Sequence, residues 1–501
     1  IANCIKNASS VVFRRFEPEV TFAETVKGMR MCGDWLFYLR AMRGGLVAYC
    51  EKPLNLHRRH PGTITRNMEG SRRYFDEFAT VRRYVGNTYR LGAEALAKIR
   101  DFTIGDLDRF GISEKAEREK IVELSTRDGK KLLPSVLFVA SDLAPGGGQM
   151  FVIRLANAWA RRGGRAVLLN TGHFPDHPKV AIKIDARVSI FHANEKAISF
   201  SDLVTRFDID LVHSAIWWAD RYVQDAIVDN PRLPWITTMH GCHETMLDNP
   251  AIDPTFGKRF KAMLERIDRF VHTADKNLRV FEKFGEPTNA LRIFNGVEVE
   301  AGAFRSRADL GLREEATVLC LATRAIAEKG WFEAVSLTET LNSQGHAVDL
   351  MLIGEGPAAD TIGKAKPANV KLYGQVEDLH SYIGAADIGL LPSSFAGESM
   401  PLILLEMMAM GKPVVATDVG SISAIVGTGV DAGGYVVPLA KGRVDLTRFL
   451  EAIRALLDVN QRAAVGKRAR ERFEEQFTMA DMVDKYDALY REAIAERSTG
   501  E

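Results

Sequence analysis

From Ser135 onward, short apolar runs alternate with longer amphipathic segments, and this alternation restricts the fold more than any other feature. Strands that alternate with helices are joined by right-handed crossovers and form parallel sheets with helices on both faces. The expected strands are Ser135–Ala140, Ala166–Asn170, Leu211–Ser214, Trp235–Met239, Phe270–Thr273 and Leu291–Phe294, followed by Thr317–Ala322, Asp349–Ile353, Val370–Tyr373, Ile388–Leu391, Pro413–Thr417 and Tyr435–Val437. The expected helices between them include Met150–Arg161, Trp331–Leu341, Pro401–Met410 and Leu446–Leu457.

Two such series, with a break near Asn295–Arg307, predict an α/β protein with two doubly wound parallel-sheet domains that face a cleft. Ligands bind at the carboxyl ends of the strands in sheets of this kind, so the cleft is the expected binding site. The predicted organisation is a partial module with a helical linker at 1–128, α/β domains at 131–297 and 298–475, and a C-terminal helix at 476–501 that returns across both domains.

Composition excludes several classes of protein. The 66 Lys and Arg residues nearly balance 65 Asp and Glu, so no global positive field favours a nucleic-acid partner. The five cysteines are scattered and odd in number, which favours reduced thiols in a cytosolic compartment. No apolar run is long enough to span a bilayer, and no signal peptide is visible. The expected location is the cytoplasm, and the first residue, Ile1, is consistent with a fragment of a longer protein.

The strongest chemical signal is Glu398-Ser-Met-Pro-Leu-Ile-Leu-Leu-Glu406, a pair of glutamates around the start of a helix. Pro401 suits a first helical turn, which places Glu398 in the loop before it and Glu406 inside an apolar stretch. A carboxylate among apolar side chains needs hydrogen-bond donors, and sugar or ribose hydroxyls would supply them. The helix N-terminus suits a diphosphate. The simpler alternative is one surface glutamate and one helix-capping glutamate.

Two cations lie after the first strand of the second series, in Ala322-Thr-Arg-Ala-Ile-Ala-Glu-Lys-Gly330. Arg324 and Lys329 would meet the negative charge that develops on a departing diphosphate. Further motifs follow in order: Ile353-Gly-Glu-Gly-Pro357, Leu372-Tyr-Gly-Gln-Val376, Ala386-Asp-Ile-Gly-Leu-Leu-Pro392, the glutamate pair and Gly411-Lys-Pro-Val-Val-Ala-Thr417. From about Lys131 to Tyr490 the sequence resembles the retaining glycosyltransferases of family 4 (glycosyl transferases group 1), which have the GT-B fold.

The resemblance implies a role for each matching position. Arg324 and Lys329 would bind the donor phosphates, Glu398 the donor sugar and Glu406 the nucleotide ribose. His240 matches an active-site histidine of the family. The other implied donor contacts are Gly147 and Gly148 of the glycine-rich loop Gly146-Gly-Gly-Gln149, together with Ser399, Met400 and Leu402.

The resemblance also implies the reaction. A sugar would move from a nucleoside-diphosphate sugar to a glycan or lipid-linked acceptor with retained anomeric configuration and no required cofactor or metal. The implied process is cell-surface polysaccharide or glycan biosynthesis. Two departures, Ser399-Met-Pro where the family commonly has Gly-Phe-Gly and Ala424 where it has a glutamate, leave the donor open. The alternatives are a non-catalytic nucleotide-sugar-binding or scaffold module and a nucleotide-sugar epimerase.

Three weaker signals have competing interpretations. His240-Gly-Cys-His-Glu244 offers metal ligands, but they crowd one loop, which favours an active-site loop over zinc. Asp106 and Asp108, like Asp208 and Asp210, are best explained as solvated turn acids. The helix expected at Lys258–Phe270 sets Phe260, Met263, Leu264 and Ile267 against several cations. It either packs on its own domain or makes a peripheral contact with the inner face of the cell membrane.

The region before Gly129 contains a second resemblance. Cys32-Gly-Asp-Trp-Leu-Phe-Tyr-Leu39 and Pro53-Leu-Asn-Leu-His-Arg-Arg-His-Pro-Gly62 resemble the C-terminal part of a family 2, GT-A-like glycosyltransferase. In that family the aspartate matching Asp34 is the general base. The nucleotide-binding half is missing here, so we expect Asp34 to be vestigial. The charged stretch Glu114–Arg127 has little apolar face and is expected to be a solvated helix or linker.

Overall fold

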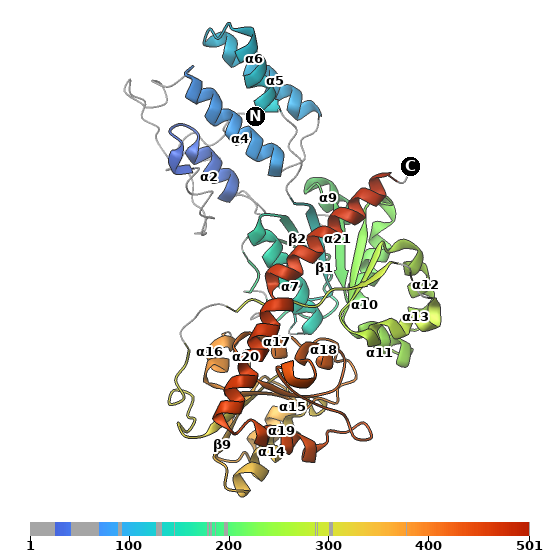
Figure 1. Ribbon diagram of the computed structural model, residues 1–501. Helices are drawn as coiled ribbons and strands as arrows, with labels where there is room; N and C mark the ends of the chain where they lie inside the picture. Colours follow the sequence, from blue (N-terminus) through green and yellow to red (C-terminus); the bar gives the residue numbers. More distant parts are fainter. Residues whose placement is uncertain are drawn as a thin grey trace. The chain divides into compact units, whose positions relative to one another are not determined.

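The computed structural model describes residues 26–41, 70–88, 93–126, 133–144, 146–177, 180, 183–185, 187–194, 199–285, 287, 289–299, 304–376 and 378–499 (Figure 1). The chain divides into two compact units. The first comprises Ile1–Phe138, Ala156–Leu169 and Ile184–Leu211, and the second comprises Val139–Leu155, Asn170–Lys183 and Val212–Glu501.

The N-terminal part of the first unit is helical where the structure describes it. Its helices are α2 (Gly33–Ala41), α4 (Arg72–Thr88), α5 (Ala93–Arg109) and α6 (Lys115–Thr126). Buried side chains from α4, α5 and α6 form one apolar cluster: Tyr74, Phe75, Leu107 and Ile121. The expected helix is therefore present as α6, but it is not solvated all round, because the buried Ile121 packs it against its neighbours.

Two further expectations for this region can be compared with the structure. Asp106 is not a solvated turn acid: it lies buried within α5 and accepts a hydrogen bond of 2.8 Å from the Tyr74 hydroxyl. Asp34 lies in the first turn of α2, where its Oδ1 accepts a hydrogen bond from the Trp35 amide. Trp35 is buried and packs edge to face against Phe78. Pro53–Gly62 lies outside the described residues.

Two parallel sheets form the rest of the fold. The first has seven strands in the order β3-β2-β1-β4-β5-β6-β7, and the second has six in the order β10-β9-β8-β11-β12-β13. In each sheet the chain moves outward from a first strand, returns, and continues on its other side, which is the doubly wound arrangement. The prediction of two doubly wound sheets is confirmed.

The strands of the first sheet are β1 (Ser135–Ala140), β2 (Arg165–Asn170), β3 (Ser189–His192), β4 (Leu211–Ala215), β5 (Trp235–Met239), β6 (Arg269–His272) and β7 (Ala290–Arg292). Those of the second are β8 (Thr317–Ala322), β9 (Val348–Ile353), β10 (Val370–Leu372), β11 (Ile388–Leu391), β12 (Val414–Thr417) and β13 (Gly434–Val437). Every expected strand is present within a residue or two at each end. The edge strand β3 was missed because it is short and alternates buried with exposed positions.

Helices connect the strands of both sheets (Figure 1). The helices between strands are α7 (Gly147–Arg162), α9 (Phe200–Arg206), α10 (Trp217–Ala226), α11 (Cys242–Asp248), α12 (Phe256–Arg266), α13 (Arg279–Phe284), α14 (Trp331–Ser343), α15 (Pro357–Gly363), α16 (Leu379–Ala385), α17 (Leu402–Ala409) and α18 (Ile422–Val426). After the last strand follow α19 (Leu446–Ala455), α20 (Val459–Gln476) and α21 (Met479–Thr499). None of the helices in the described ranges combines the length and hydrophobicity that a membrane crossing requires.

The apolar side of α12 is packed inside the protein. Phe256, Phe260 and Met263 are buried, and the Phe260 ring lies near Phe270 and Phe281. A membrane would meet only the polar side of this helix, so the apolar anchor that a peripheral contact needs is already used in the core. The structure therefore supports packing of α12 on its own domain rather than a peripheral membrane contact.

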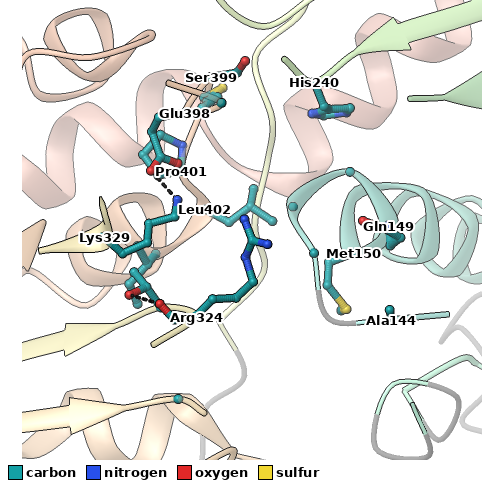
Figure 2. A pocket seen from close by; sticks show the side chains of 18 of the residues that line it. Ala144, Gln149, Met150, His240, Arg324, Lys329, Glu398, Ser399, Pro401 and Leu402 are labelled. Atoms are coloured by element: carbon teal, nitrogen blue, oxygen red, sulfur yellow. Dashed lines mark hydrogen bonds and ion pairs between the residues drawn. The ribbon is translucent and has the colours of Figure 1, made fainter. Parts of the chain in front are cut away.

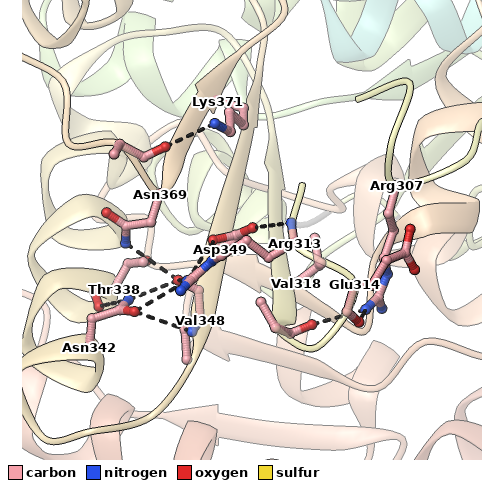
Figure 3. Close-up of polar contacts among 12 residues, drawn as sticks. Arg307, Arg313, Glu314, Val318, Thr338, Asn342, Val348, Asp349, Asn369 and Lys371 are labelled. Carbon is pink, nitrogen blue, oxygen red and sulfur yellow. Dashed lines mark hydrogen bonds and ion pairs between the residues drawn. The ribbon is translucent and has the colours of Figure 1, made fainter. Parts of the chain in front are cut away.

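Two arginines anchor the connection that leads into β8 (Figure 3). Arg313 donates hydrogen bonds from Nε and Nη2 to Oδ1 of Asp349, at 2.9 and 2.7 Å, and Asp349 is buried at the start of β9. Arg307 donates to the carbonyl oxygens of Glu314 and Ala316, both at 2.9 Å. Two hydrogen bonds from one guanidinium group restrict its orientation, so these contacts hold the segment that leads into β8, and Arg324 lies just beyond the far end of that strand.

The last helix, α21, returns from the second sheet to pack against strands of the first. The Tyr490 hydroxyl lies 2.5 Å from Nδ1 of His213 in β4, and the Tyr486 hydroxyl lies 2.9 Å from the Thr238 hydroxyl in β5. His213 is 1% exposed, and its burial, with His240 as a second cause, lowers its pKa to about 3.

Because His213 is buried, we expect the folded protein to lose stability in mildly acidic solution. In the unfolded chain a histidine takes up a proton below pH about 6.5, whereas folded His213 stays neutral down to about pH 3. The free energy of unfolding should therefore be unaffected by His213 above pH 6.5 and fall by about 1.4 kcal/mol per pH unit below it. Thermal unfolding between pH 7.5 and 5 measures this fall. The variant His213→Gln should flatten the profile, and an unchanged slope in that variant would contradict the assignment.

Candidate functional site

A cavity of about 640 Å³ lies in the second unit at the carboxyl ends of strands from both sheets. Its walls come from the loops after β1, β5, β8 and β11 and from helices α7 and α17. In a doubly wound sheet the strand order reverses beside the first strand, here at β1/β4 and at β8/β11, and ligands bind at that point. Asp34 does not line this cavity, whereas all the residues predicted for the donor site do: Gly147, Gly148, His240, Arg324, Lys329, Glu398, Ser399, Met400, Leu402 and Glu406.

The glycine-rich loop after β1 opens α7 at one wall of the cavity (Figure 2). Gly148 is needed for close approach, because a Cβ there would lie 2.6 Å from Cγ2 of Ile216. Gln149 on the same turn donates to the buried Asp142 carboxylate at 3.2 Å. At its glycines the loop therefore presents backbone to the cavity.

On the opposite wall, Lys329 and Glu398 form a buried ion pair (Figure 2). The Ser393 hydroxyl also donates to Oε2 of Glu398, at 3.2 Å. Gly330, which follows Lys329, has a φ of +81°, and a Cβ there would lie 2.1 Å from the Pro392 carbonyl oxygen. This glycine allows the turn that brings Lys329 to the loop after β11. The sequence placed both charged residues at the site but did not predict that they pair.

Arg324 is exposed and extends into the cavity from the loop after β8 (Figure 2). Its guanidinium lies 5.4 Å from the centre of the Phe395 ring, and the Lys329 ammonium lies 4.7 Å from the same ring. Among the described residues, no carboxylate pairs with Arg324. The guanidinium of Arg324 thus faces the cavity without a neutralising carboxylate among the described residues, as a phosphate-binding group requires.

Glu406 is 3% exposed within α17, and its carboxylate is paired with a basic side chain of the protein itself. Arg154 of α7 donates from Nη2 to Oε1 of Glu406 at 2.5 Å. We expected ribose hydroxyls to be the donors that this carboxylate needs, so the structure adds a residue that the sequence reasoning missed. A signal was present: Arg154 is the lone charge in Phe151-Val-Ile-Arg-Leu-Ala156, just as Glu406 is in its own apolar helix.

His240 ends β5 and lines the cavity beside Phe151, with ring centres 4.6 Å apart. Burial, with nearby His243 as a second cause, lowers its pKa to about 3, so the imidazole is neutral at physiological pH. No described residue hydrogen-bonds its Nε2 atom. A neutral ring nitrogen at a cavity wall can exchange a hydrogen bond with a ligand hydroxyl, and it is a poor proton acceptor at neutral pH.

The loop before α17 is held in place by residues from the first sheet's side of the cavity. Asn277 donates to the Ser399 hydroxyl at 3.1 Å, and the Asn295 amide lies 3.0 Å from the Met400 sulfur. Pro401 is the N-cap residue of α17, and Leu402 is its first residue. These contacts place Ser399, Met400 and Leu402 along the cavity wall.

The cluster after β5 is a hydrogen-bonded network. His243 pairs with Asp220 at 2.9 Å, and Glu244 accepts from the Asn277 amide at 2.5 Å. Asp220 also accepts from the hydroxyls of Ser214 and Thr237, at 2.6 and 2.7 Å. Within the part of the chain that the structure describes, no group of His, Cys, Asp or Glu side chains is arranged to hold a metal ion.

Comparisons with known proteins agree with this geometry. Residues 145–301 match the family described as Glycosyltransferase Family 4, and residues 316–459 match Glycosyl transferases group 1. Neither match extends into the region before the first sheet, so the family 2, GT-A-like resemblance of that region gains no support.

Relatives with described activities are glycosyltransferases. The chain is 28% identical over 233 residues to a teichuronic acid biosynthesis glycosyltransferase, TuaC, of Bacillus subtilis, covering 44% of this chain and 55% of TuaC. It is 24% identical over 318 residues to N-acetyl-alpha-D-glucosaminyl L-malate synthase of Bacillus anthracis, covering 61% of this chain and 80% of that protein. It is 24% identical over 242 residues to UDP-Gal:alpha-D-GlcNAc-diphosphoundecaprenol alpha-1,3-galactosyltransferase of Escherichia coli, covering 45% of this chain and 60% of that protein. The chain thus spans little more than half the length of two of these relatives.

Solved structures share the two-sheet fold. Sucrose-phosphate synthase from Thermosynechococcus elongatus has a TM-score of 0.58 at 21% identity, and covers 72% of this chain and 100% of its own. Anabaena HepE, solved with UDP-glucose, has a TM-score of 0.56 at 18% identity with the same coverage. At these identities the likeness establishes the fold alone.

Proposed function

We propose that this chain, whose fold is GT-B-like, is a glycosyltransferase that moves a sugar from a nucleoside-diphosphate sugar to an acceptor hydroxyl with retained configuration. One observation carries the proposal: an arginine with no carboxylate partner among the described residues, a lysine–glutamate pair, a buried glutamate and a glycine-rich helix start all line one cavity. Arg324 and Lys329 would bind the diphosphate and stabilise the charge that builds on it as the glycosidic bond breaks. Glu406 would bind the ribose.

The roles of the other groups follow from their protonation and position. Neutral His240 would exchange a hydrogen bond with a sugar hydroxyl through the ring nitrogen that has no partner among the described residues. Glu398, held by Lys329, would face the donor sugar. In this scheme the leaving phosphate helps to deprotonate the acceptor, and the two cations supply the positive charge, so we expect no metal requirement.

The acceptor class is proposed from the names of the relatives. The galactosyltransferase of Escherichia coli acts on a diphosphoundecaprenol-linked sugar, and TuaC acts in teichuronic acid biosynthesis. A glycan or lipid-linked acceptor in cell-surface polysaccharide assembly therefore suits this chain. A non-catalytic binding module or an epimerase is not favoured, because these relatives are transferases.

The test begins with thermal unfolding in the presence of UDP, GDP or ADP in excess EDTA. The correct nucleotide should stabilise the chain by about 2.7 kcal/mol at a hundredfold excess over its dissociation constant. Transfer from the matching sugar donors to a glycan acceptor follows, with the anomeric configuration of the product read by proton NMR. Retention supports the proposal, and an inverted product contradicts it. The absence of both binding and transfer would overturn the donor assignment. Asp34→Asn is the control and should transfer normally.

A further inference from the structure

The contact between Arg154 and Glu406 joins the two walls of the cavity. Arg154 belongs to α7, which begins at the glycine-rich loop, and Glu406 belongs to α17, which begins after the Glu398 loop. The two residues are 252 positions apart in the chain, and their side chains meet at 2.5 Å. An ionised carboxylate that is 3% exposed needs a close opposite charge, and Arg154 supplies it.

A single hydrogen bond joins the guanidinium and the carboxylate of this ion pair. Only Nη2 of Arg154 donates, and only Oε1 of Glu406 accepts. Nη1 of Arg154 is buried with no hydrogen-bond partner in the described structure, and no described donor reaches Oε2 of Glu406. Arginine and carboxylate commonly form two parallel hydrogen bonds, which would have satisfied both atoms. The observed arrangement leaves one carboxylate oxygen available beside the cavity that Glu406 lines.

We propose that Arg154 is a positioning residue for the donor's ribose. It holds Glu406 through Oε1, so that Oε2 is left to accept a hydrogen bond from a ribose hydroxyl. This inference rests on the proposed function, because it needs a ribonucleotide in the cavity. It assigns Arg154 the task of fixing the carboxylate's orientation, and it makes the ion pair responsible for selecting ribose over deoxyribose.

A competing mechanism uses the same contact. Arg154 could instead occupy the ribose position in the free protein, so that the nucleotide has to displace it. The two mechanisms predict opposite effects of removing the arginine. Loss of a positioning residue weakens ribonucleotide binding and abolishes selection for the hydroxyl, whereas loss of a competitor strengthens binding and preserves that selection.

The experiment is calorimetry on the full chain with whichever of UDP, GDP and ADP binds, and with its 2′-deoxy and 3′-deoxy forms. A hydrogen bond to a charged group predicts that the wild type prefers the ribonucleotide by about tenfold or more over one deoxy form. In Arg154→Gln this ratio should fall close to one, as it should in Glu406→Gln. Arg154→Lys keeps the charge and should restore part of the ratio. Arg161→Gln removes another arginine of α7, one that is 3.9 Å from Asp185, and should leave the ratio unchanged.

The outcomes separate the two proposals. An unchanged ratio in Arg154→Gln overturns the positioning role, and so does tighter binding of both nucleotide forms with the ratio preserved. Either result leaves the transferase function intact, because the wild type still binds the nucleotide. Failure of the wild type to bind any of the three nucleotides overturns the proposed donor and the inference together. Circular dichroism and thermal unfolding of each variant establish that the compared proteins are folded.

Discussion

Replacing Lys329 with alanine should lower the turnover number by about a hundredfold, the usual effect of removing one preorganised group that stabilises developing charge. The ammonium group of Lys329 lines the cavity and pairs with Glu398, and both side chains are buried. Removing it also leaves a buried carboxylate without its partner, which predicts a loss of about 3 kcal/mol of unfolding free energy. Steady-state kinetics and thermal unfolding of the same preparation measure the two effects.

Arg324→Ala is the informative comparison. Arg324 extends into the same cavity, but it is exposed and has no carboxylate partner among the described residues. Its removal should lower turnover on the same scale without measurably changing stability. Glu328→Ala, at the exposed neighbour of Lys329, should change neither quantity. If Lys329→Ala raised only the Michaelis constant and kept the turnover number, the lysine would bind ground state and transition state equally.

The second large effect concerns stability rather than turnover. Asp220 is fully buried in α10 and accepts hydrogen bonds from Ser214 and Thr237 while pairing with His243. Asp220→Ala would leave these buried groups without their common partner, which predicts a loss of about 3–5 kcal/mol of unfolding free energy. The midpoint of thermal unfolding should fall by on the order of 10 °C.

A matched control lies on the same helix. Asp225 pairs with Arg259 at 2.8 Å, but its side chain is 64% exposed. Asp225→Ala should therefore cost less than about 1 kcal/mol, the usual value for a surface ion pair. Equal losses in the two variants would show that the buried network around Asp220 contributes no more than an exposed contact.

Local sequence patterns were sufficient to locate most of the elements. A strand buried on both faces has to be apolar along its length, as in Ser135–Ala140, and short apolar runs between helical segments are therefore recognisable. The pattern was weakest where burial was partial. The edge strand β3 was missed for this reason, and the packing of α6 on its neighbours was missed because its few apolar residues gave no clear stripe.

The sequence also determined which residues line the cavity, because the loops after parallel strands meet at one edge of each sheet. It placed the glycines, His240, both cations and both glutamates at the site. Only the tertiary structure decided how the charges pair: Lys329 with Glu398, and Glu406 with Arg154. A lone charge in an apolar helix shows that a partner is needed. Which of the many charged residues meets it depends on how two helices far apart in the chain are brought together, and no local pattern contains that information.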